Sequence, residues 1–202
     1  LSLRGKGNSQ DSLLYFIKEF IIILKLMKNK SVAIICGDPE STFNEILIKT
    51  LKNKVYKNSK FPIIIICSEK LFRNELKKLK TKLNLQKFEN QINLHKNQIY
   101  IIDIPLKKGK LSLIKKNEYI KKSFDVGLNL LKKNSLLTLI NGPISKASFL
   151  KGKYKGITEY LALKTGSLNE VMLIFNRELS VSPITTHVTI NKVSQKIKKE
   201  VI

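Results

Sequence analysis

The apolar residues of the chain fall into short unbroken runs that alternate with longer amphipathic segments. The runs predict six strands, at residues 31–36, 61–67, 99–104, 136–140, 171–175 and 181–186. Apolar runs without polar alternation are typical of strands that are covered on both faces, as in a parallel sheet.

The segments between these runs repeat their apolar positions with the period of a helix. They predict helices at residues 42–51, 69–82, 117–133, 158–165 and 191–201. Ser41 or Thr42 is a candidate N-cap of the first helix, and Gly166 closes the fourth. Strands that alternate with helices of this length indicate an α/β fold, with three α/β/α layers around a mostly parallel sheet.

The first part of the chain differs from the rest. We expect residues 1–26 to be a non-native upstream extension, because Met27 begins a segment typical of a bacterial cytosolic enzyme. The alternative is an N-terminal helix that packs on the domain. The apolar stretch at 13–27 is short and contains Lys18 and Glu19, so it predicts neither a transmembrane helix nor, without a cleavage site, a signal peptide.

The formal net charge of +23 raises the question of an anionic partner such as nucleic acid or a membrane. Of the 38 basic residues, only Arg4, Arg73 and Arg177 are arginine. Nucleic-acid readers usually rely on arginine for bidentate contacts. The abundant lysine, asparagine and isoleucine all have A/T-rich codons. We therefore favour solvated surface lysines, and expect neither a nucleic-acid nor a membrane partner.

The cysteine content bears on the compartment. Cys36 and Cys67 each lie at the end of an apolar run, a position typical of buried free thiols. Two such residues predict neither a disulfide framework nor a structural zinc site. We expect a reducing compartment, the cytoplasm.

Two loops follow predicted strands at the edge where open α/β sheets bind ligands. In the first loop, Gly37 permits a tight turn, and Asp38 either serves function or forms a simple Asx turn. In the second, Ser145 and Lys146 follow Gly142-Pro143 and enter a helix, an arrangement that favours a phosphate site. Neither a Walker A loop nor a G-x-G-x-x-G fingerprint is present.

Two later loops contain further candidates. Thr158 and Glu159 stand at a predicted helix start, where a capping role would also explain them. His187 directly follows a strand and two threonines, a position that favours function. His95 lies in a polar stretch and is expected at the surface.

Together the loops resemble the family of 4-hydroxythreonine-4-phosphate dehydrogenases of vitamin B6 biosynthesis, from about Lys30 to Val201. GDPESTFNEI is similar to the family's GDPAGIGPEI, and LINGPISKASFL to its strand-TxPxxK loop. KGITEYLALKTG is similar to PGHTE-x-LA-x-x-TG, and VMLIFNRELSVSPITTHVTI to VMML…LRVALVTTHIPL. Four segments in the same order are far more specific than any one of them.

The resemblance implies a fold like the isocitrate and isopropylmalate dehydrogenases, of which residues 27–202 would form the N-terminal and central part. It implies a homodimer with the active site at the subunit interface. It also implies NAD-dependent oxidation and decarboxylation of 4-phosphooxy-L-threonine, a small phosphorylated amino acid. A divalent metal (Zn, Mg or Co) held by three histidines would assist the reaction.

Carried over residue by residue, the resemblance implies roles for six positions. His187 matches a metal ligand, and Lys146 and Asp38 match catalytic positions. The substrate-binding positions are Ser145, Lys146, Thr158 and Thr186.

The three-histidine metal site is only partly present in this sequence. Ile157 stands where the family has its second ligand histidine, and the third belongs to a family segment beyond Ile202.

Two alternatives remain open from the sequence. One is a related dehydrogenase for another 4-phosphorylated hydroxy acid, such as threonate or erythronate phosphate. The other is a non-catalytic relative that binds a phosphorylated ligand, or a polyanion through its lysines, and would then bind nucleic acid in a salt-sensitive way.

Overall fold

The computed structural model describes residues 31–53, 61–89, 94–107, 109–133, 138–167, 170–176, 178–186 and 188–197. The predicted extension at 1–26 lies outside them. The chain divides into two compact units, the first ending at Ile144 and the second beginning at Ser145. None of the described helices is both long enough and apolar enough to span a bilayer.

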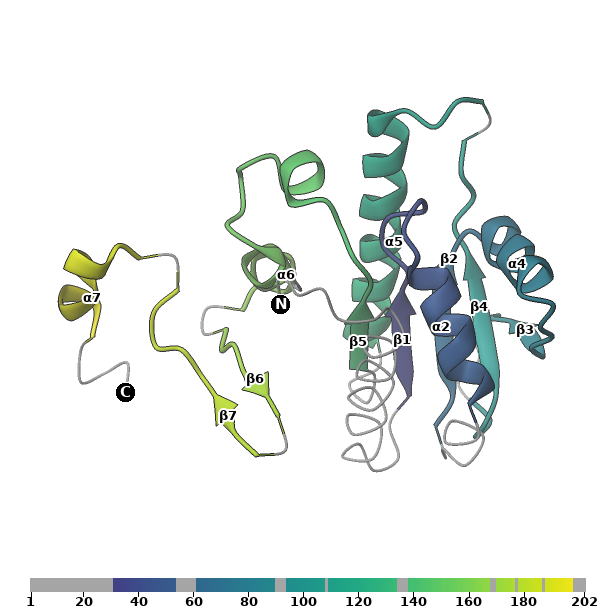
Figure 1. Ribbon diagram of the computed structural model, residues 1–202, viewed down its shortest axis with the longest axis horizontal. Helices are drawn as coiled ribbons and strands as arrows, with labels where there is room; N and C mark the ends of the chain where they lie inside the picture. Colours follow the sequence, from purple (N-terminus) through teal and green to yellow (C-terminus); the bar gives the residue numbers. More distant parts are fainter. Residues whose placement is uncertain are drawn as a thin grey trace. The chain divides into compact units, whose positions relative to one another are not determined.

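The first unit is built on a five-stranded sheet in which every neighbouring pair of strands is parallel (Figure 1). Its order is β3-β4-β2-β1-β5. The strands are β1 (Val32–Ile35), β2 (Ile63–Cys67), β3 (Leu85–Lys87), β4 (Ile99–Asp103) and β5 (Thr138–Asn141). The predicted α/β class with a parallel sheet is confirmed.

Helices cover both faces of this sheet and complete three layers (Figure 1). Helices α2 (Phe43–Lys52) and α4 (Glu69–Lys78) pack over the face that carries Ile34 and Ile65. Helix α5 (Leu113–Lys133) packs on the opposite face, where Gly127 lets it approach Ile35 closely. Residues on both faces of β1 and β2 are buried, which explains why these strands appear as unbroken apolar runs.

Three elements of the first unit differ from the prediction. Helix α4 ends at Lys78 rather than at residue 82, and Lys80 beyond it has a left-handed backbone with φ of +47°. Strand β3 was missed because it is a three-residue edge strand, mostly exposed, with no apolar run. Helix α5 begins at Leu113 rather than at residue 117. The Ser112 hydroxyl accepts a hydrogen bond from the Lys115 N–H at 3.4 Å, a capping contact that starts the helix earlier.

The second unit contains the π-helix η1 (Lys146–Leu150), α6 (Ile157–Thr165), β6 (Ile174–Phe175), β7 (Ser180–Val181) and α7 (Ile190–Lys196). Strands β6 and β7 form a separate antiparallel pair, and each is shorter than the strand predicted there, at 171–175 and 181–186. Both strands are only two residues long and exposed, and their apolar side chains do not form the covered core that the runs suggested. Gly166 ends α6 with φ of +71°, as predicted.

The two cysteines are free and buried, as predicted, at the carboxyl ends of β1 and β2. A hydrogen bond with Cys36 and burial both raise the pKa of the Cys67 thiol. Tyr119 of α5 reaches the same place, where its hydroxyl accepts a hydrogen bond from the Ser68 N–H at 2.9 Å. Burial above all, and then the thiols Cys67 and Cys36, raise the pKa of Tyr119 far beyond the ordinary tyrosine range. The Cys67 thiol and the Tyr119 hydroxyl therefore stay protonated at neutral pH.

We predict that Tyr119→Phe lowers the free energy of unfolding by about 1–3 kcal/mol near neutral pH, because the buried Ser68 N–H loses its acceptor. Above about pH 10 the unfolded wild-type chain releases the Tyr119 proton while the folded chain keeps it. The free energy of unfolding of the wild type then falls by up to about 1.4 kcal/mol per pH unit because of Tyr119. The difference in free energy of unfolding between wild type and Tyr119→Phe therefore becomes smaller. Urea unfolding of both proteins at neutral and alkaline pH measures this difference in free energy of unfolding. A difference that does not change with pH contradicts the prediction.

Candidate functional site

The loops that follow β1 and β5 are in close backbone contact at two glycines, Gly37 and Gly142. A Cβ atom added to Gly37 would lie 2.3 Å from the Pro143 carbonyl oxygen, and one added to Gly142 would lie 2.4 Å from the Cys36 carbonyl oxygen. The Asp38 N–H donates a hydrogen bond to that Pro143 oxygen at 2.8 Å. Gly37 also has φ of +75°, which favours glycine on its own. The two loops are therefore in direct backbone contact at the carboxyl edge of the sheet.

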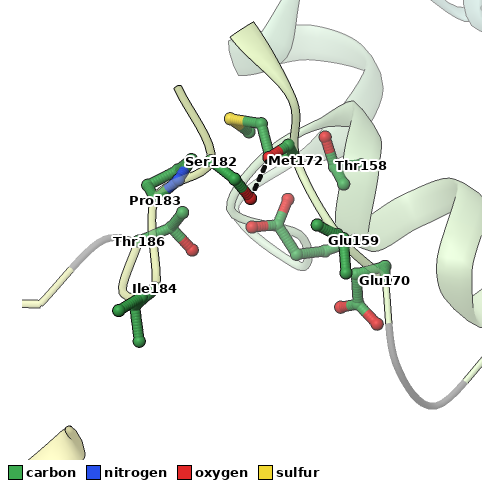
Figure 2. Close-up of a pocket in the computed structure, with 9 residues that line it drawn as sticks. Thr158, Glu159, Glu170, Met172, Ser182, Pro183, Ile184 and Thr186 are labelled. Carbon is green, nitrogen blue, oxygen red and sulfur yellow. Dashed lines mark hydrogen bonds between the residues drawn. The ribbon is translucent and has the colours of Figure 1, made fainter. Parts of the chain in front are cut away.

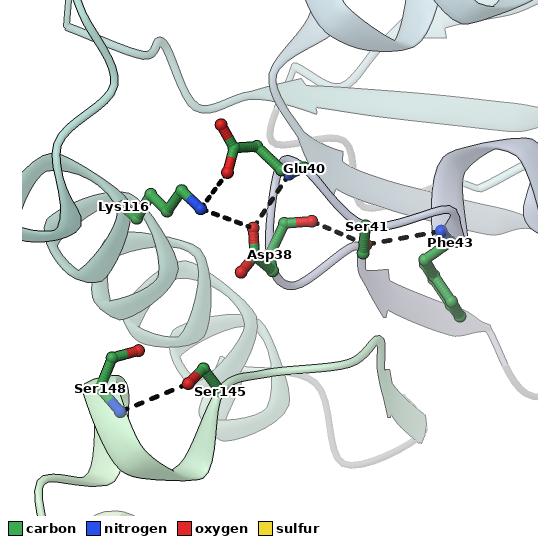
Figure 3. A network of polar contacts seen from close by, with 7 residues as sticks. All are labelled: Asp38, Glu40, Ser41, Phe43, Lys116, Ser145 and Ser148. Carbon is green, nitrogen blue, oxygen red and sulfur yellow. Dashed lines mark hydrogen bonds and ion pairs between the residues drawn. The ribbon is translucent and has the colours of Figure 1, made fainter. Parts of the chain in front are cut away.

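Asp38 lies at the start of a tight turn inside the first loop (Figure 3). Its carboxylate accepts a hydrogen bond from the Glu40 N–H at 2.9 Å, and its carbonyl oxygen accepts one from the Ser41 hydroxyl at 2.7 Å. The Asx turn that the sequence allowed is present. A catalytic role for Asp38 stays a prediction.

Lys116 of α5 joins this loop and was missed by the sequence analysis. Its ammonium contacts the Glu40 carboxylate and lies 3.8 Å from that of Asp38 (Figure 3). Glu40 above all, with Asp38, raises the pKa of Lys116 against the opposing effect of burial, so the ammonium stays charged. The predicted helix began after Lys116, and no local pattern linked this residue to a loop far back in the chain.

In the second unit, Ser145 and Lys146 begin η1. The Ser145 hydroxyl accepts a hydrogen bond from the Ser148 N–H at 3.4 Å (Figure 3). The side chain of Lys146 is exposed. The predicted helix start is confirmed, but this helix has only five residues. So short a helix has little dipole to offer an anion, and any phosphate binding would depend on the Lys146 charge and the Ser145 hydroxyl.

A hollow of about 460 Å³ in the second unit brings Thr158 and Thr186 together (Figure 2). Glu159 and Glu170 lie next to each other on one side of it. The Ser182 hydroxyl donates a hydrogen bond to the Met172 carbonyl at 2.9 Å and joins the two segments that flank β6 and β7, which we call the β6–β7 arm. The complete lining is Thr158, Glu159, Glu170, Val171, Met172, Ser182, Pro183, Ile184 and Thr186. Glu170 and Ser182 were not among the predicted site residues, although Ser182 lies inside the segment similar to VMML…LRVALVTTHIPL and Glu170 directly precedes it.

An aromatic cluster holds the start of α6 in place beside this hollow. The Tyr160 ring packs edge to face against Phe149 at 5.4 Å and against Tyr154 at 5.2 Å between ring centroids. Such pairs stabilise a contact beyond the area they bury. Because Tyr160 is buried, Thr158 and Glu159 on the preceding turn are presented from a fixed helix.

The described residues do not fit a three-histidine metal centre. Ile157, an apolar residue, opens α6 where the resemblance expects a ligand. Across the described ranges, no three side chains among histidine, cysteine, aspartate and glutamate are grouped to hold a metal ion. The predicted metal ligand His187 lies outside those ranges.

The model of the family described as "Pyridoxal phosphate biosynthetic protein PdxA" matches residues 59–202. The chain is 28% identical over 186 residues to the 4-hydroxythreonine-4-phosphate dehydrogenase of Aquifex aeolicus, covering 86% of this chain and 55% of that protein. It is 27% identical over 178 residues to the D-threonate 4-phosphate dehydrogenase of Salmonella typhimurium, covering 82% and 53%. The chain thus spans about half the length of these relatives.

Solved structures agree on the fold. A 4-hydroxythreonine-4-phosphate dehydrogenase from Burkholderia phymatum matches with a TM-score of 0.70 and 22% identity, over 85% of this chain and 54% of that one. The enzyme of that name from Klebsiella pneumoniae matches with a TM-score of 0.67 and 19% identity, over 86% and 55%.

The glycine contact yields a test with a matched control. Gly37→Ala should lower the free energy of unfolding by about 2–5 kcal/mol, the sum of a left-handed backbone penalty and an overpacking penalty. Gly109→Ala should cost about 1–2 kcal/mol, because Gly109 also has positive φ but a Cβ there lies no closer than 3.4 Å to any described neighbour, the flexible Lys115 ammonium. Urea unfolding of the two variants measures the difference, and equal losses would contradict the steric argument.

Proposed function

Since this chain belongs to the PdxA family, we propose that it takes part in the NAD-dependent oxidation of 4-phosphooxy-L-threonine. The alcohol carbon next to the amino-bearing carbon loses a hydride, and its hydroxyl loses a proton, giving a ketone. That ketone is a β-keto acid, and it then loses CO2. NAD would supply the hydride acceptor. The reaction would take place in the cytoplasm, in the pathway to pyridoxal phosphate.

The observation that supports this substrate is the hollow between α6 and the β6–β7 arm. The hydroxyls of Thr158 and Thr186 can hydrogen-bond the substrate's polar groups. The carboxylates of Glu159 and Glu170 would attract its ammonium group. The exposed ammonium of Lys146, with the Ser145 hydroxyl, would bind its phosphate.

Asp38 and Lys146 are the proposed catalytic residues. A carboxylate in hydrogen-bond reach of an alcohol can accept its proton as the hydride leaves. One Asp38 oxygen already accepts the Glu40 N–H and faces Lys116, which fixes the orientation of the carboxylate. The Lys146 ammonium would hold negative charge that develops on the substrate.

D-Threonate 4-phosphate is the second candidate substrate, because one group of relatives carries its name. It has a hydroxyl where 4-phosphooxy-L-threonine has an ammonium. Carboxylates at 159 and 170 stabilise a cation and gain little from a neutral hydroxyl. This charge argument favours the amino acid.

We further propose that the protein acts as a homodimer. The second unit exposes large apolar side chains, among them Val171 at 76% and Ile190 at 93% exposure. Apolar surface of this kind is typical of protein interfaces. Sedimentation of the protein in solution measures its oligomeric state, which we expect to be a dimer.

The activity itself is tested by mixing the chain with NAD and each substrate, with Zn, Mg or Co supplied, and following NADH by absorbance. We expect NADH with 4-phosphooxy-L-threonine, and loss of most of the rate in Asp38→Asn and Lys146→Met. No NADH from either phosphorylated acid with any of these metals would refute a dehydrogenase.

Substrate choice has a separate test by calorimetric titration. The double variant Glu159→Gln, Glu170→Gln should bind 4-phosphooxy-L-threonine about tenfold more weakly, because two carboxylates no longer face the ammonium. Its affinity for D-threonate 4-phosphate should hold or rise. Glu178→Gln, an exposed residue away from the hollow, is the control and should change neither affinity. An equal loss for both ligands would contradict the assignment.

A further inference from the structure

A basic groove lies in the first unit, where α4 ends and the chain turns toward β3. One hollow of about 570 Å³ carries four cationic side chains, those of Arg73, Lys77, Lys80 and Lys82. A second hollow of about 290 Å³ shares Lys82 with the first and adds the amides of Asn84, Asn97 and Gln98. The two hollows adjoin at Lys82 and Leu83, which line both, and we call them together the basic groove.

The charge of the basic groove is not compensated locally. No aspartate or glutamate is among the described residues that line either hollow. Arg73 pairs with Glu69 at 2.6 Å, but Lys77, Lys80 and Lys82 form no ion pair with any carboxylate in the described ranges. Like charges gathered around a concave surface focus the potential and attract anions.

Lys80 occupies a backbone position that suits glycine. Helix α4 ends in a Schellman motif, in which the Thr81 N–H donates to the Leu76 carbonyl and the Lys80 N–H to the Lys77 carbonyl, both at 3.0 Å. Lys80 therefore has φ of +47°, a left-handed conformation that is unfavourable for a side chain with a Cβ. This helix end places Lys80 in the same hollow as Lys77 and Lys82.

The basic groove lies at the opposite edge of the sheet from the Gly37 and Gly142 loops. Because the strands are parallel, those loops are at the carboxyl edge, whereas α4 runs back to the amino edge. There Ile99, the first residue of β4, lines the second hollow. A ligand bound at the carboxyl edge would therefore not contact the cationic side chains of the basic groove.

Against the expectation from composition, which assigned the lysines to a solvated surface, we propose that the basic groove binds the phosphodiester backbone of a single-stranded nucleic acid. Lysine ammonium groups act as point charges that accept phosphates in many orientations, without the fixed fork of arginine. The amide groups of Asn84, Asn97 and Gln98 can bond phosphate oxygens and sugar hydroxyls. No aromatic ring is among the described lining residues, so the groove contacts the phosphates and sugars rather than stacking on the bases. Contacts of that kind carry no sequence information, and binding is therefore independent of sequence.

Fluorescence anisotropy with a labelled oligouridylate of about 20 nucleotides, longer than a typical single-strand site, tests this with two charge-matched triple variants. Lys77→Gln, Lys80→Gln, Lys82→Gln removes three exposed lysines of the groove, and Lys121→Gln, Lys122→Gln, Lys132→Gln removes three exposed lysines of α5. The groove variant should bind about tenfold more weakly, and its slope of log affinity against log salt should shrink by about 2. The α5 variant should change affinity less than about twofold. Equal losses in the two variants overturn the proposal, as does tight binding of inorganic polyphosphate with none of the oligouridylate.

Lys80→Gly separates binding from folding. Glycine relieves the left-handed strain, so the variant should melt about 4 °C higher than wild type. Loss of one phosphate contact should weaken oligouridylate binding about threefold and reduce the salt slope by about 0.7. A variant that is more stable but binds as tightly as wild type overturns the role of Lys80 in the groove, and with it the proposal.

Discussion

The backbone contact between the ends of β1 and β5 is the constraint on which the carboxyl edge of the sheet depends. Gly37 and Gly142 lie so close to the facing carbonyl groups that neither can carry a side chain without a backbone shift. Because the contact fixes the first loop, Asp38 is held at the start of its turn, within reach of Lys116. A glycine is thus required at both Gly37 and Gly142, although the sequence alone does not reveal the backbone contact that constrains these two positions.

The sequence predicts the centre of the fold well and its margins poorly. Strands β1, β2 and β4 are evident because both of their faces are mostly buried, which requires apolar residues at successive positions. Strand β3 has a single neighbour and lies at an edge, so burial selects almost none of its residues. The apolar segments around β6 and β7 give the opposite error. They predicted longer, covered strands, but their apolar side chains are exposed and the strands are only two residues long.

In the candidate site, some residues can be identified from short sequence motifs, whereas others are brought there only by the fold. Thr158 and Thr186 could be named from short motifs, and the structure brings them to one hollow. Lys116 could not, because it contacts Glu40, which is far away in the sequence. Glu170 could not, because only the fold brings it to the hollow. The helix at Lys146 was expected, but its shortness follows from the αL residue Lys151, which ends it after five residues.

The paired thiols at the ends of β1 and β2 give the protein an internal reporter. Cys36 and Cys67 expose 3% and 1% of their surface, and both lie under the helices that cover the sheet. A thiol reagent can reach them only when that layer separates, so the labelling rate measures how often the sheet opens. The described part of the chain contains no other cysteine, and the signal would come from this one place without an introduced probe.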